Sequence, residues 1–300
     1  MTDLTLAIAL PLLGAFLLPV VARGGLRWLG ALLGPGLLLL SALVVFANAS
    51  TYESPYAIAL GGFSPPLGIT FYVDPLALLF ALAIPLTTLM LWPGADDDAG
   101  TRRQSLTLLL AASLTGLALS GDLFNLYVFY ELAAVASYGL AAGSGSSTGF
   151  VAAFRYLLIS ALGSVVGLMG IALIYFNTGT LNLAHLVTLS EKLANPQGLA
   201  AFAMLVIGFG VKAELFPVNG WVPEVYGATS KRVAALLAGL ASKLAVLAIV
   251  RILLLVFPHE EARQLLLVLG IIGVISGELA AYQARDITRM LGWSSIGQLG

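Results

Sequence analysis

The stretch LAAFAMLVIGFGVKAELFPVNGWVPEVYG, residues 199–227, decides the fold class of this chain. It opens with an apolar run long enough to cross a bilayer as a helix, and Lys212 lies inside that run. Pro217 and Pro223 follow, and a proline removes one helical hydrogen bond and clashes with the carbonyl four residues back. A helix broken at membrane depth persists only where it is buried in protein or lines a hydrated cavity. The sequence therefore predicts a membrane bundle with a broken helix near 212–223.

The composition of the whole chain agrees with a membrane environment. Of the 300 residues, 59% are hydrophobic and 10% are charged, whereas soluble domains carry about 25% charged residues. The net charge of −1 gives no indication of a nucleic-acid partner. The absence of cysteine excludes disulfides, thiolate-held iron–sulfur clusters and cysteine zinc sites. We expect no cofactor and no metal, so any redox chemistry would reside in partner chains.

Apolar stretches long enough to span a bilayer recur along the chain, and no soluble domain interrupts them. We expect an all-α, polytopic membrane helix bundle of about nine to ten transmembrane helices. The first apolar run has no basic residues ahead of it, which suits a retained span better than a cleaved signal peptide. A tenth span begins near Leu291, and the other nine lie near 4–21, 27–47, 75–92, 104–120, 123–142, 150–175, 199–216, 232–257 and 264–283.

The basic residues of the connections are shared unevenly between the two sides of the membrane. If the nine spans alternate, only Lys192 and Arg263 fall on one side. Because cytoplasmic loops carry an excess of Lys and Arg, we expect a multi-pass protein of the bacterial inner (plasma) membrane, with the N-terminus outside and residues 285–289 in the cytoplasm. The basic residues on the rich side are Arg23, Arg27, Arg102, Arg103, Arg155, Lys231, Arg232, Arg285 and Arg289.

Three ionisable residues, Glu131, Lys212 and Lys243, lie deep inside predicted spans. A charge at mid-bilayer costs about 2.5–3.5 kcal/mol even on a lenient insertion scale, and such residues usually face the bundle interior and serve a transport path. The alternatives are a helix–helix hydrogen bond for Glu131 and snorkelling of the lysines to the interface. Tyr127 and Tyr138 share a helix face with Glu131. We favour a transport role for all three residues.

Other charged residues lie nearer to span ends, where a structural role competes with a functional one. Glu214 is two positions from Lys212, on roughly the opposite helix face, so we expect no direct pairing and a role in orienting the break. For Arg251 there are two alternatives, a functional role inside the bundle and snorkelling of its side chain to the interface. Glu278 lies about two turns from the end of its span. These residues are candidates for accessory roles.

Two aspartates precede predicted spans and are expected to cap helices. Asp122 follows a glycine in the tight turn between the fourth and fifth spans, and Asp74 comes directly before Pro75. The run at positions 96–98 is expected to be a solvated loop, and His185 to be an ordinary loop or interface histidine.

Four segments, in this order and spacing, resemble motifs of the antiporter-like membrane subunit superfamily. They resemble its fifth-helix motif, its seventh-helix motif with a lysine and a Phe-Pro…Trp-x-Pro break, its eighth helix with a lysine and a terminal arginine, and the connection into its tenth helix. The segments are SGDLFNLYVFYE at 120–131, KAELFPVNGWVPEVYG at 212–227, VAALLAGLASKLAVLAIVRIL at 233–253 and RDITRMLGWSSIGQLG at 285–300.

The superfamily includes the D-type subunits of multisubunit Na+/H+ antiporters and the antiporter-like subunits of complex I and membrane-bound hydrogenases. The resemblance implies five-helix inverted repeats, each forming a half-channel, and a proton path through Glu131, Lys212 and Lys243. Because burial disfavours a charged lysine and a nearby carboxylate favours it, we expect approach or withdrawal of Glu131 to change the proton occupancy of Lys212. The resemblance also implies three regions: N-terminal helices one to three in 1–97, the proton-channel repeat in 104–257, and the start of a truncated second repeat in 258–300.

The chain departs from the family pattern near the helix break and in length. Asn219 stands where a histidine is common, and Tyr226 stands at a second such position. Glu224 stands where aspartate is frequent and is a further accessory candidate. Family members usually have fourteen helices, so the resemblance implies either a shortened protein or another chain that supplies the second repeat.

The resemblance implies a proton-translocating subunit of a multisubunit Na+/H+-type antiporter, without a redox centre of its own. The partners would be other membrane subunits, protons, Na+ and membrane lipid. One alternative is a proton-pumping membrane subunit of a complex I-like NADH–quinone oxidoreductase, a translocase, or of a membrane-bound hydrogenase. A further alternative is a scaffold or the membrane subunit of an inorganic-carbon uptake complex.

Overall fold

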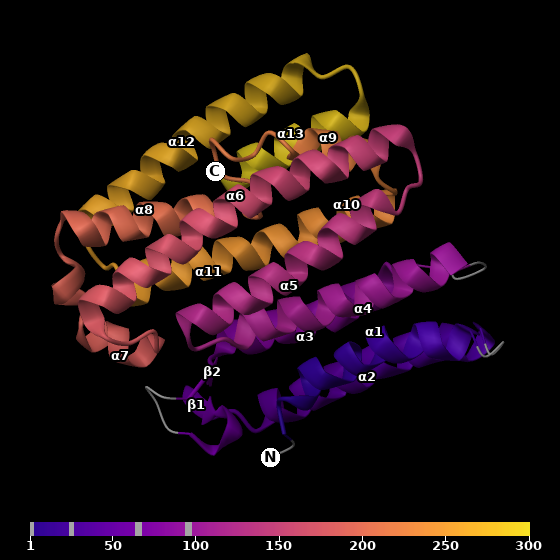
Figure 1. The fold of residues 1–300 in the computed structure, drawn as a ribbon, viewed down its shortest axis with the longest axis horizontal. Helices are drawn as coiled ribbons and strands as arrows, with labels where there is room; N and C mark the ends of the chain where they lie inside the picture. The colour runs from indigo at the N-terminus through magenta and orange to yellow at the C-terminus, as the bar shows by residue number, and fades with distance from the viewer. Residues whose placement is uncertain (1–2, 24–26, 64–67, 94–97) are drawn as a thin grey trace.

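The computed structural model describes residues 3–23, 27–63, 68–93 and 98–300, and it consists mainly of long helices that run alongside one another (Figure 1). The predicted all-α membrane bundle is confirmed. Its helices are α1 (Leu6–Arg23), α2 (Arg27–Ser50), α3 (Pro75–Met90), α4 (Asp98–Leu119), α5 (Leu123–Ala142), α6 (Ser147–Thr178), α7 (Leu183–Thr188), α8 (Pro196–Gly210), α9 (Val222–Ala228), α10 (Lys231–Leu236), α11 (Ser242–Leu255), α12 (Glu260–Gln283) and α13 (Ile287–Leu299), with the short helical turns η1 (Leu60–Gly62), η2 (Ser190–Leu193) and η3 (Leu237–Ala241).

The bundle exposes apolar side chains and buries charged ones, as membrane proteins do. Among the described residues, six helices are long and apolar enough to cross a bilayer, and α3 and α8 are shorter apolar helices. Large apolar side chains such as Leu162 and Phe176 of α6 point outward, at 71% and 83% exposure, whereas Lys212 and Glu214 are buried. The six helices are Leu6–Arg23, Ala31–Ser50, Leu123–Ala142, Ser147–Thr178, Lys231–Leu255 and Glu260–Gln283.

The N-terminal and C-terminal helices lie at opposite edges of the bundle. In Figure 1, α1 and α2 form one edge, α3, α4 and α5 follow, and α12 with α13 forms the opposite edge. Helices α6 and α8 pack closely, and their backbones meet at Gly167 and Gly208: a Cβ atom on Gly208 would lie 2.7 Å from the Cα of Gly167. Small residues allow this approach, as in many membrane helix pairs.

The helix predicted to be broken is broken. Helix α8 ends at Gly210, residues 211–221 form turns, and α9 begins at Val222. Pro223 lies in the first turn of α9, where its missing N–H costs no hydrogen bond. Pro217 follows a cis peptide bond inside the turns. Neither proline therefore lies in a helix interior: Pro217 lies in the turns between α8 and α9, and Pro223 lies in the first turn of α9.

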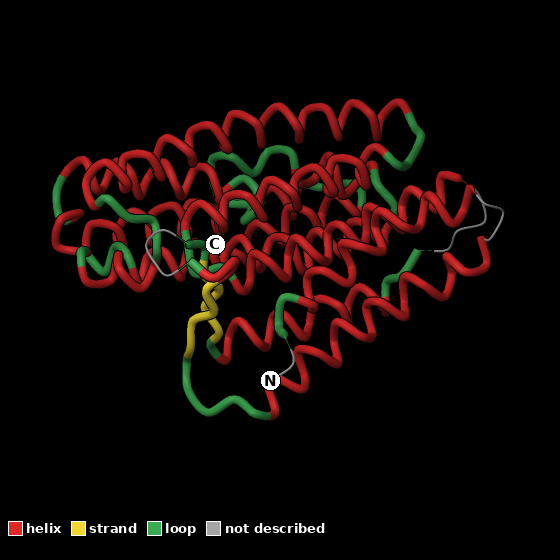
Figure 2. Tube along the Cα trace, turned by 60° about the horizontal axis from the view of Figure 1, so that its bottom comes forward, coloured by secondary structure: helices red, strands yellow, loops and turns green. Residues whose placement is uncertain are grey.

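A small sheet, which the sequence analysis did not predict, lies in the connection between α2 and α3. Strands β1 (Tyr56–Ala59) and β2 (Thr70–Val73) pair antiparallel and lie outside the helical bundle (Figure 2). The amide of Gly121, in the α4–α5 turn, donates to the Thr70 carbonyl at 2.9 Å. Phe71 and Val73 are buried against the helices. Four-residue strands in a Gly- and Pro-rich connection give too short a pattern for a prediction.

Both expected aspartate caps are present. The Asp74 carboxylate accepts from the amide of Ala77 at 2.6 Å and begins α3. The Asp122 carboxylate accepts from the amides of Phe124 and Asn125 and begins α5. His185 lies exposed on α7. The acidic run at 96–98 lies outside the residues whose side chains the structure describes.

Basic residues gather at one end of the bundle. Arg103, Lys231 and Arg232 line a cavity of about 320 Å³ between α3, α4, α5 and α10. Arg155 and Arg289 line a second cavity, of about 290 Å³, between α6, α9 and α13. All five belong to the set of basic residues that the sequence analysis assigned to one side of the membrane.

Candidate functional site

Lys212 is held at the helix break by a cage of tyrosine rings. Its side chain is 3% exposed, and its Nζ atom lies 4.5 Å from the ring centroid of Tyr130, 5.6 Å from that of Tyr138 and 5.5 Å from that of Tyr156. Nζ also lies 3.5 Å from the Tyr156 hydroxyl. Aromatic faces attract a cation, and the attraction grows when the cation is removed from water. We call Tyr130, Tyr138 and Tyr156 the tyrosine cage.

The cage is positioned by α5 and α6 and closed by the break itself. Tyr130 and Tyr138 are eight residues apart on α5, which puts them on one face. The Tyr130 hydroxyl donates to the Gly208 carbonyl of α8 at 2.6 Å. Tyr156 of α6 stacks on Trp221, with 3.8 Å between centroids, and the Trp221 indole N–H donates to the Val211 carbonyl at 2.9 Å. The aromatic residues therefore satisfy carbonyls near the broken helix end.

Glu131 lies beside the cage without touching the lysine. Its carboxylate is half-buried and acts electrostatically on Lys212. Within the described part of the chain, no ion pair within 4.0 Å joins the two residues, and the Glu131 Oε1 atom is buried with no hydrogen-bond partner. The Lys212 ammonium is thus held by rings, and the Glu131 carboxylate acts on it without forming an ion pair among the described residues.

Glu214 faces the other side of the break. It is fully buried, with φ at +58°, and its Oε1 atom accepts a hydrogen bond of 2.5 Å from the Tyr226 hydroxyl. The carboxylate also interacts electrostatically with Lys243, and with the hydroxyls of Ser242 and Ser295. The expectation that Glu214 does not pair directly with the lysine two positions earlier agrees with this arrangement.

Lys243 lies in the first turn of α11, directly after a defect in the helix. Residues Leu237–Ala241 form the π-helical turn η3, and Lys243 is half-buried. Such turns are rare and frequently lie at functional sites. Lys243 is a residue that the sequence predicts for the site, whereas this turn is not predicted from the sequence. Gly239 inside it, one helical turn before the lysine, is the signal available in the sequence.

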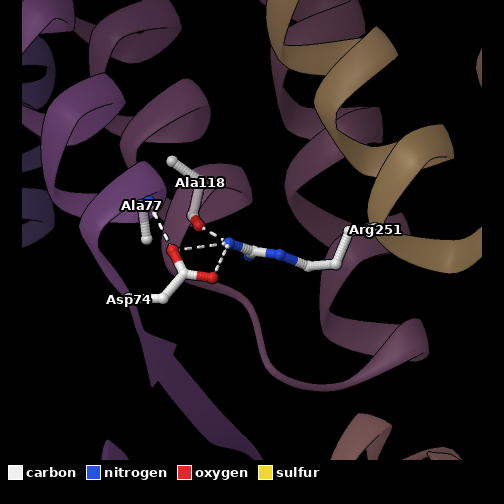
Figure 3. Close-up of polar contacts among 4 residues, drawn as sticks. All are labelled: Asp74, Ala77, Ala118 and Arg251. Carbon is white, nitrogen blue, oxygen red and sulfur yellow. Dashed lines mark hydrogen bonds and ion pairs between the residues drawn. The ribbon is translucent and has the colours of Figure 1, made fainter. Parts of the chain in front are cut away.

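Arg251 does not snorkel to the interface, which corrects one of the two expectations for it. The side chain is buried, and its guanidinium bonds both carboxylate oxygens of Asp74 and the carbonyl of Ala118 (Figure 3). Asp74 begins α3 and Ala118 lies near the end of α4. Arg251 therefore ties α11 to two helices from the other half of the chain.

The remaining accessory candidates lie away from the cage. Glu224 accepts from Arg155 at 2.7 Å at the basic end of the bundle, where both side chains are exposed. Glu278 is exposed on α12, with its carboxylate beside Gly297 of α13. No group of three His, Asp or Glu side chains that could hold a metal ion occurs in the described ranges.

The model of one protein family, described as "NADH:quinone oxidoreductase/Mrp antiporter, TM", matches residues 120–300. This chain belongs to that family. The matched region contains the tyrosine cage, the helix break, Glu214 and Lys243. The resemblance inferred from the four sequence motifs is therefore confirmed.

Relatives of this antiporter-like protein are found in two kinds of complex. The chain is 35% identical to the N-type subunit of the NADH-quinone oxidoreductase of Desulforudis audaxviator, covering 87% of this chain and 54% of that protein. It is 30% identical to the D-type subunit of the Na(+)/H(+) antiporter of Alkalihalophilus pseudofirmus, covering 88% and 55%. The chain thus spans about half the length of the curated relatives it matches.

A solved structure shares the fold over the whole antiporter-like chain. The archaeal membrane-bound sulfane sulfur reductase, a respiratory membrane complex, contains a chain that is 32% identical, with a TM-score of 0.92, covering 100% of this chain and 63% of that one. The match extends over helices on both sides of the break.

Proposed function

We propose that this antiporter-like protein translocates protons across the membrane, as part of a multisubunit cation/proton antiporter of the Na+/H+ type. Glu131, Lys212 and Lys243 carry the proton path, and Pro217 and Pro223 keep open the helix break that the path crosses. In this proposal residues 104–257 form one proton-channel repeat. Residues 1–97 flank it, and residues 258–300 begin a second repeat.

The observation that carries the proposal is the tyrosine cage around Lys212. Burial disfavours the ammonium form of a lysine, whereas ring faces and a nearby carboxylate favour it. The two effects oppose one another, so a small movement can decide whether Lys212 binds or releases a proton. At an effective dielectric constant of 20, a carboxylate that closes to 4 Å contributes about 4 kcal/mol. In this proposal Glu131, which makes no ion pair with Lys212 among the described residues, moves into such a contact.

The proposed partners are other membrane subunits, with protons and Na+ as transported ions and membrane lipid around the bundle. Relatives of this chain are subunits of antiporters and oxidoreductases, and they are about twice as long as the region matched here. We infer that a second repeat, in the same or another chain, completes the path.

The proposed orientation has the N-terminus outside the bacterial inner membrane and the basic end of the bundle in the cytoplasm. The positive-inside bias supports it. Since the chain has no cysteine, single cysteines can be introduced and labelled without a background. With Lys192→Cys and Arg285→Cys in intact cells, an impermeant maleimide should label only the first. Labelling of Arg285→Cys but not Lys192→Cys would reverse the orientation.

Proton flux in vesicles containing the native complex tests the function. Lys212→Ala and Glu131→Gln should each lower the flux by about tenfold or more, the range expected when one proton-transfer group is removed. Lys192→Ala, at an exposed lysine outside the site, is the matched control and should leave the flux unchanged. Wild-type flux in either site variant, with the complex assembled, would overturn the proposal.

A second candidate function is a proton-pumping subunit of a redox-driven complex. The observations that favour it are the 35% identity to an NADH-quinone oxidoreductase subunit and the fold shared with the sulfane sulfur reductase. Purification of the complex from native membranes distinguishes the two. Co-purifying flavin or iron–sulfur chains would support the redox-driven complex, and a set of small membrane subunits without them would support the antiporter.

A further inference from the structure

Glu214 carries an unused acceptor atom in the interior of the bundle. Its carboxylate is fully buried, and Oε1 is engaged by the Tyr226 hydroxyl. Oε2 is buried and, among the residues that the structure covers, has no hydrogen-bond partner. Buried polar atoms nearly always find a partner, because an unpaired one costs about 1–3 kcal/mol. An unpaired carboxylate oxygen beside a proton path is a place where a proton can bind.

Turn geometry does not account for a glutamate at this position. Residue 214 has φ at +58°, a conformation that glycine adopts without strain and that other residues adopt at a cost of about 1–3 kcal/mol. No hydrogen bond connects the Glu214 side chain to a backbone amide in the described residues, so it does not cap either helix end. Glycine would serve the turn better, and the carboxylate therefore has another role.

The position of Glu214 connects the two lysines. On one side it acts electrostatically on Tyr156, whose hydroxyl is 3.5 Å from Lys212 Nζ. On the other side it acts electrostatically on Lys243, and the hydroxyls of Ser242 and Ser295 lie near the carboxylate without bonding Oε2. Both serines are buried, and a hydroxyl can accept and donate a proton at once. The carboxylate thus interacts with the Tyr156 hydroxyl of the cage and with Lys243 of α11.

We propose that Glu214, oriented by Tyr226, is a proton-binding site between Lys212 and Lys243. This inference rests on the proposed function. In the first step the Lys212 ammonium loses a proton and Glu214 Oε2 gains it, which leaves a neutral amine and a neutral carboxylic acid. In the second step the acid releases that proton towards a neutral Lys243 amine, which becomes an ammonium. Tyr226 keeps Oε1 occupied in both states and so directs the proton to Oε2.

Three substitutions at one position separate a proton site from a structural turn. Glu214→Gln keeps size and the bond from Tyr226 but cannot bind and release the proton, and Glu214→Gly relieves the backbone conformation. Both should lower proton flux by about tenfold or more in the native complex, whereas Glu214→Asp should retain part of it. If the residue serves the turn alone, Glu214→Gly keeps full flux, and that result overturns the inference.

Infrared difference spectroscopy of the purified complex at a series of pH values measures the protonation of the Glu214 carboxyl group independently of proton flux. We expect a carboxylic-acid C=O band that disappears in Glu214→Gln and persists in Glu224→Gln, the control at an exposed carboxylate. The same band in both variants contradicts the inference. Normal flux in Glu214→Gln with loss in Lys212→Ala refutes only the Glu214 site, whereas normal flux in Lys212→Ala refutes the proposed function.

Discussion

Arg251 and Asp74 are joined by an ion pair across 177 residues of sequence, with Arg251 Nη2 at 3.1 Å and 3.0 Å from the two carboxylate oxygens. The same carboxylate caps α3 through the amide of Ala77, and the same guanidinium donates to the Ala118 carbonyl at 3.0 Å. One charge pair therefore fixes the ends of α3 and α4 to α11. Lys243 lies two helical turns before Arg251 on α11, so this connection also fixes the helix that carries the second lysine.

Removal of one partner of this pair should destabilise the bundle strongly. Arg251→Met leaves the half-buried Asp74 charge without its partner, and we expect a cost near the lower end of the about 3–5 kcal/mol that follows the loss of one member of a buried pair. The matched comparison is Arg155→Met, which breaks the exposed pair with Glu224 and should cost about 0–1 kcal/mol. Unfolding in detergent, followed by circular dichroism, measures both.

The double variant Asp74→Asn with Arg251→Met should be less destabilised than the sum of the two single variants, because neither charge is then left buried without its partner. An additive result would show that the two residues act independently.

The ring of Tyr138, and not its hydroxyl, should support Lys212. Tyr138→Phe keeps an aromatic face towards the ammonium, so proton flux should stay near the wild-type level. Tyr138→Leu removes an interaction worth about 2 kcal/mol at a desolvated site, which corresponds to a loss of roughly tenfold or more in occupancy of the charged form. Flux assays in vesicles measure this difference, and equal flux in the two variants would contradict a cation–π role.

The close approach of α6 and α8 should tolerate no side chain at Gly208. An added Cβ would lie 2.7 Å from the Cα of Gly167, and the Gly208 carbonyl is the acceptor for Tyr130. Gly208→Ala should therefore cost about 1–3 kcal/mol of stability through overpacking and should also disturb the tyrosine cage. Gly36→Ala is the control, because a Cβ there meets no atom within 4 Å. Thermal unfolding should show a clear loss of stability for Gly208→Ala and a much smaller loss, or a gain, for Gly36→Ala.

Asp286 should stabilise the start of α13 in a pH-dependent way. The hydroxyl of Thr288 and the amide of Arg289 hold the pKa of Asp286 below its usual value of 3.8. Because the folded-state pKa is lowered, the contribution is present at neutral pH and is lost as pH falls through the lowered pKa. Hydrogen exchange of the first α13 amides should accelerate in Asp286→Ala at neutral pH. If the two proteins exchange equally at neutral pH, the cap has no effect.

The sequence by itself determined the membrane bundle, the break and the residues worth testing. Apolar run length, proline position and a charge within an apolar run are local properties, and the bilayer acts on each segment separately. The caps at Asp74 and Asp122 were also predictable, because a cap involves residues within one helical turn.

Only the tertiary structure decided which groups meet. That Lys212 faces three tyrosines instead of Glu131, that Glu214 bonds Tyr226, and that Arg251 pairs with Asp74 all depend on how α5, α6, α9 and α11 are rotated about their axes. The strands β1 and β2 are each four residues long and are stabilised by pairing with each other and by packing against the α4–α5 turn. Because these contacts join segments that are distant in the chain, the sequence of either strand alone does not predict it. Partner choice is a property of packing between distant segments, and spacing along a single segment does not contain it.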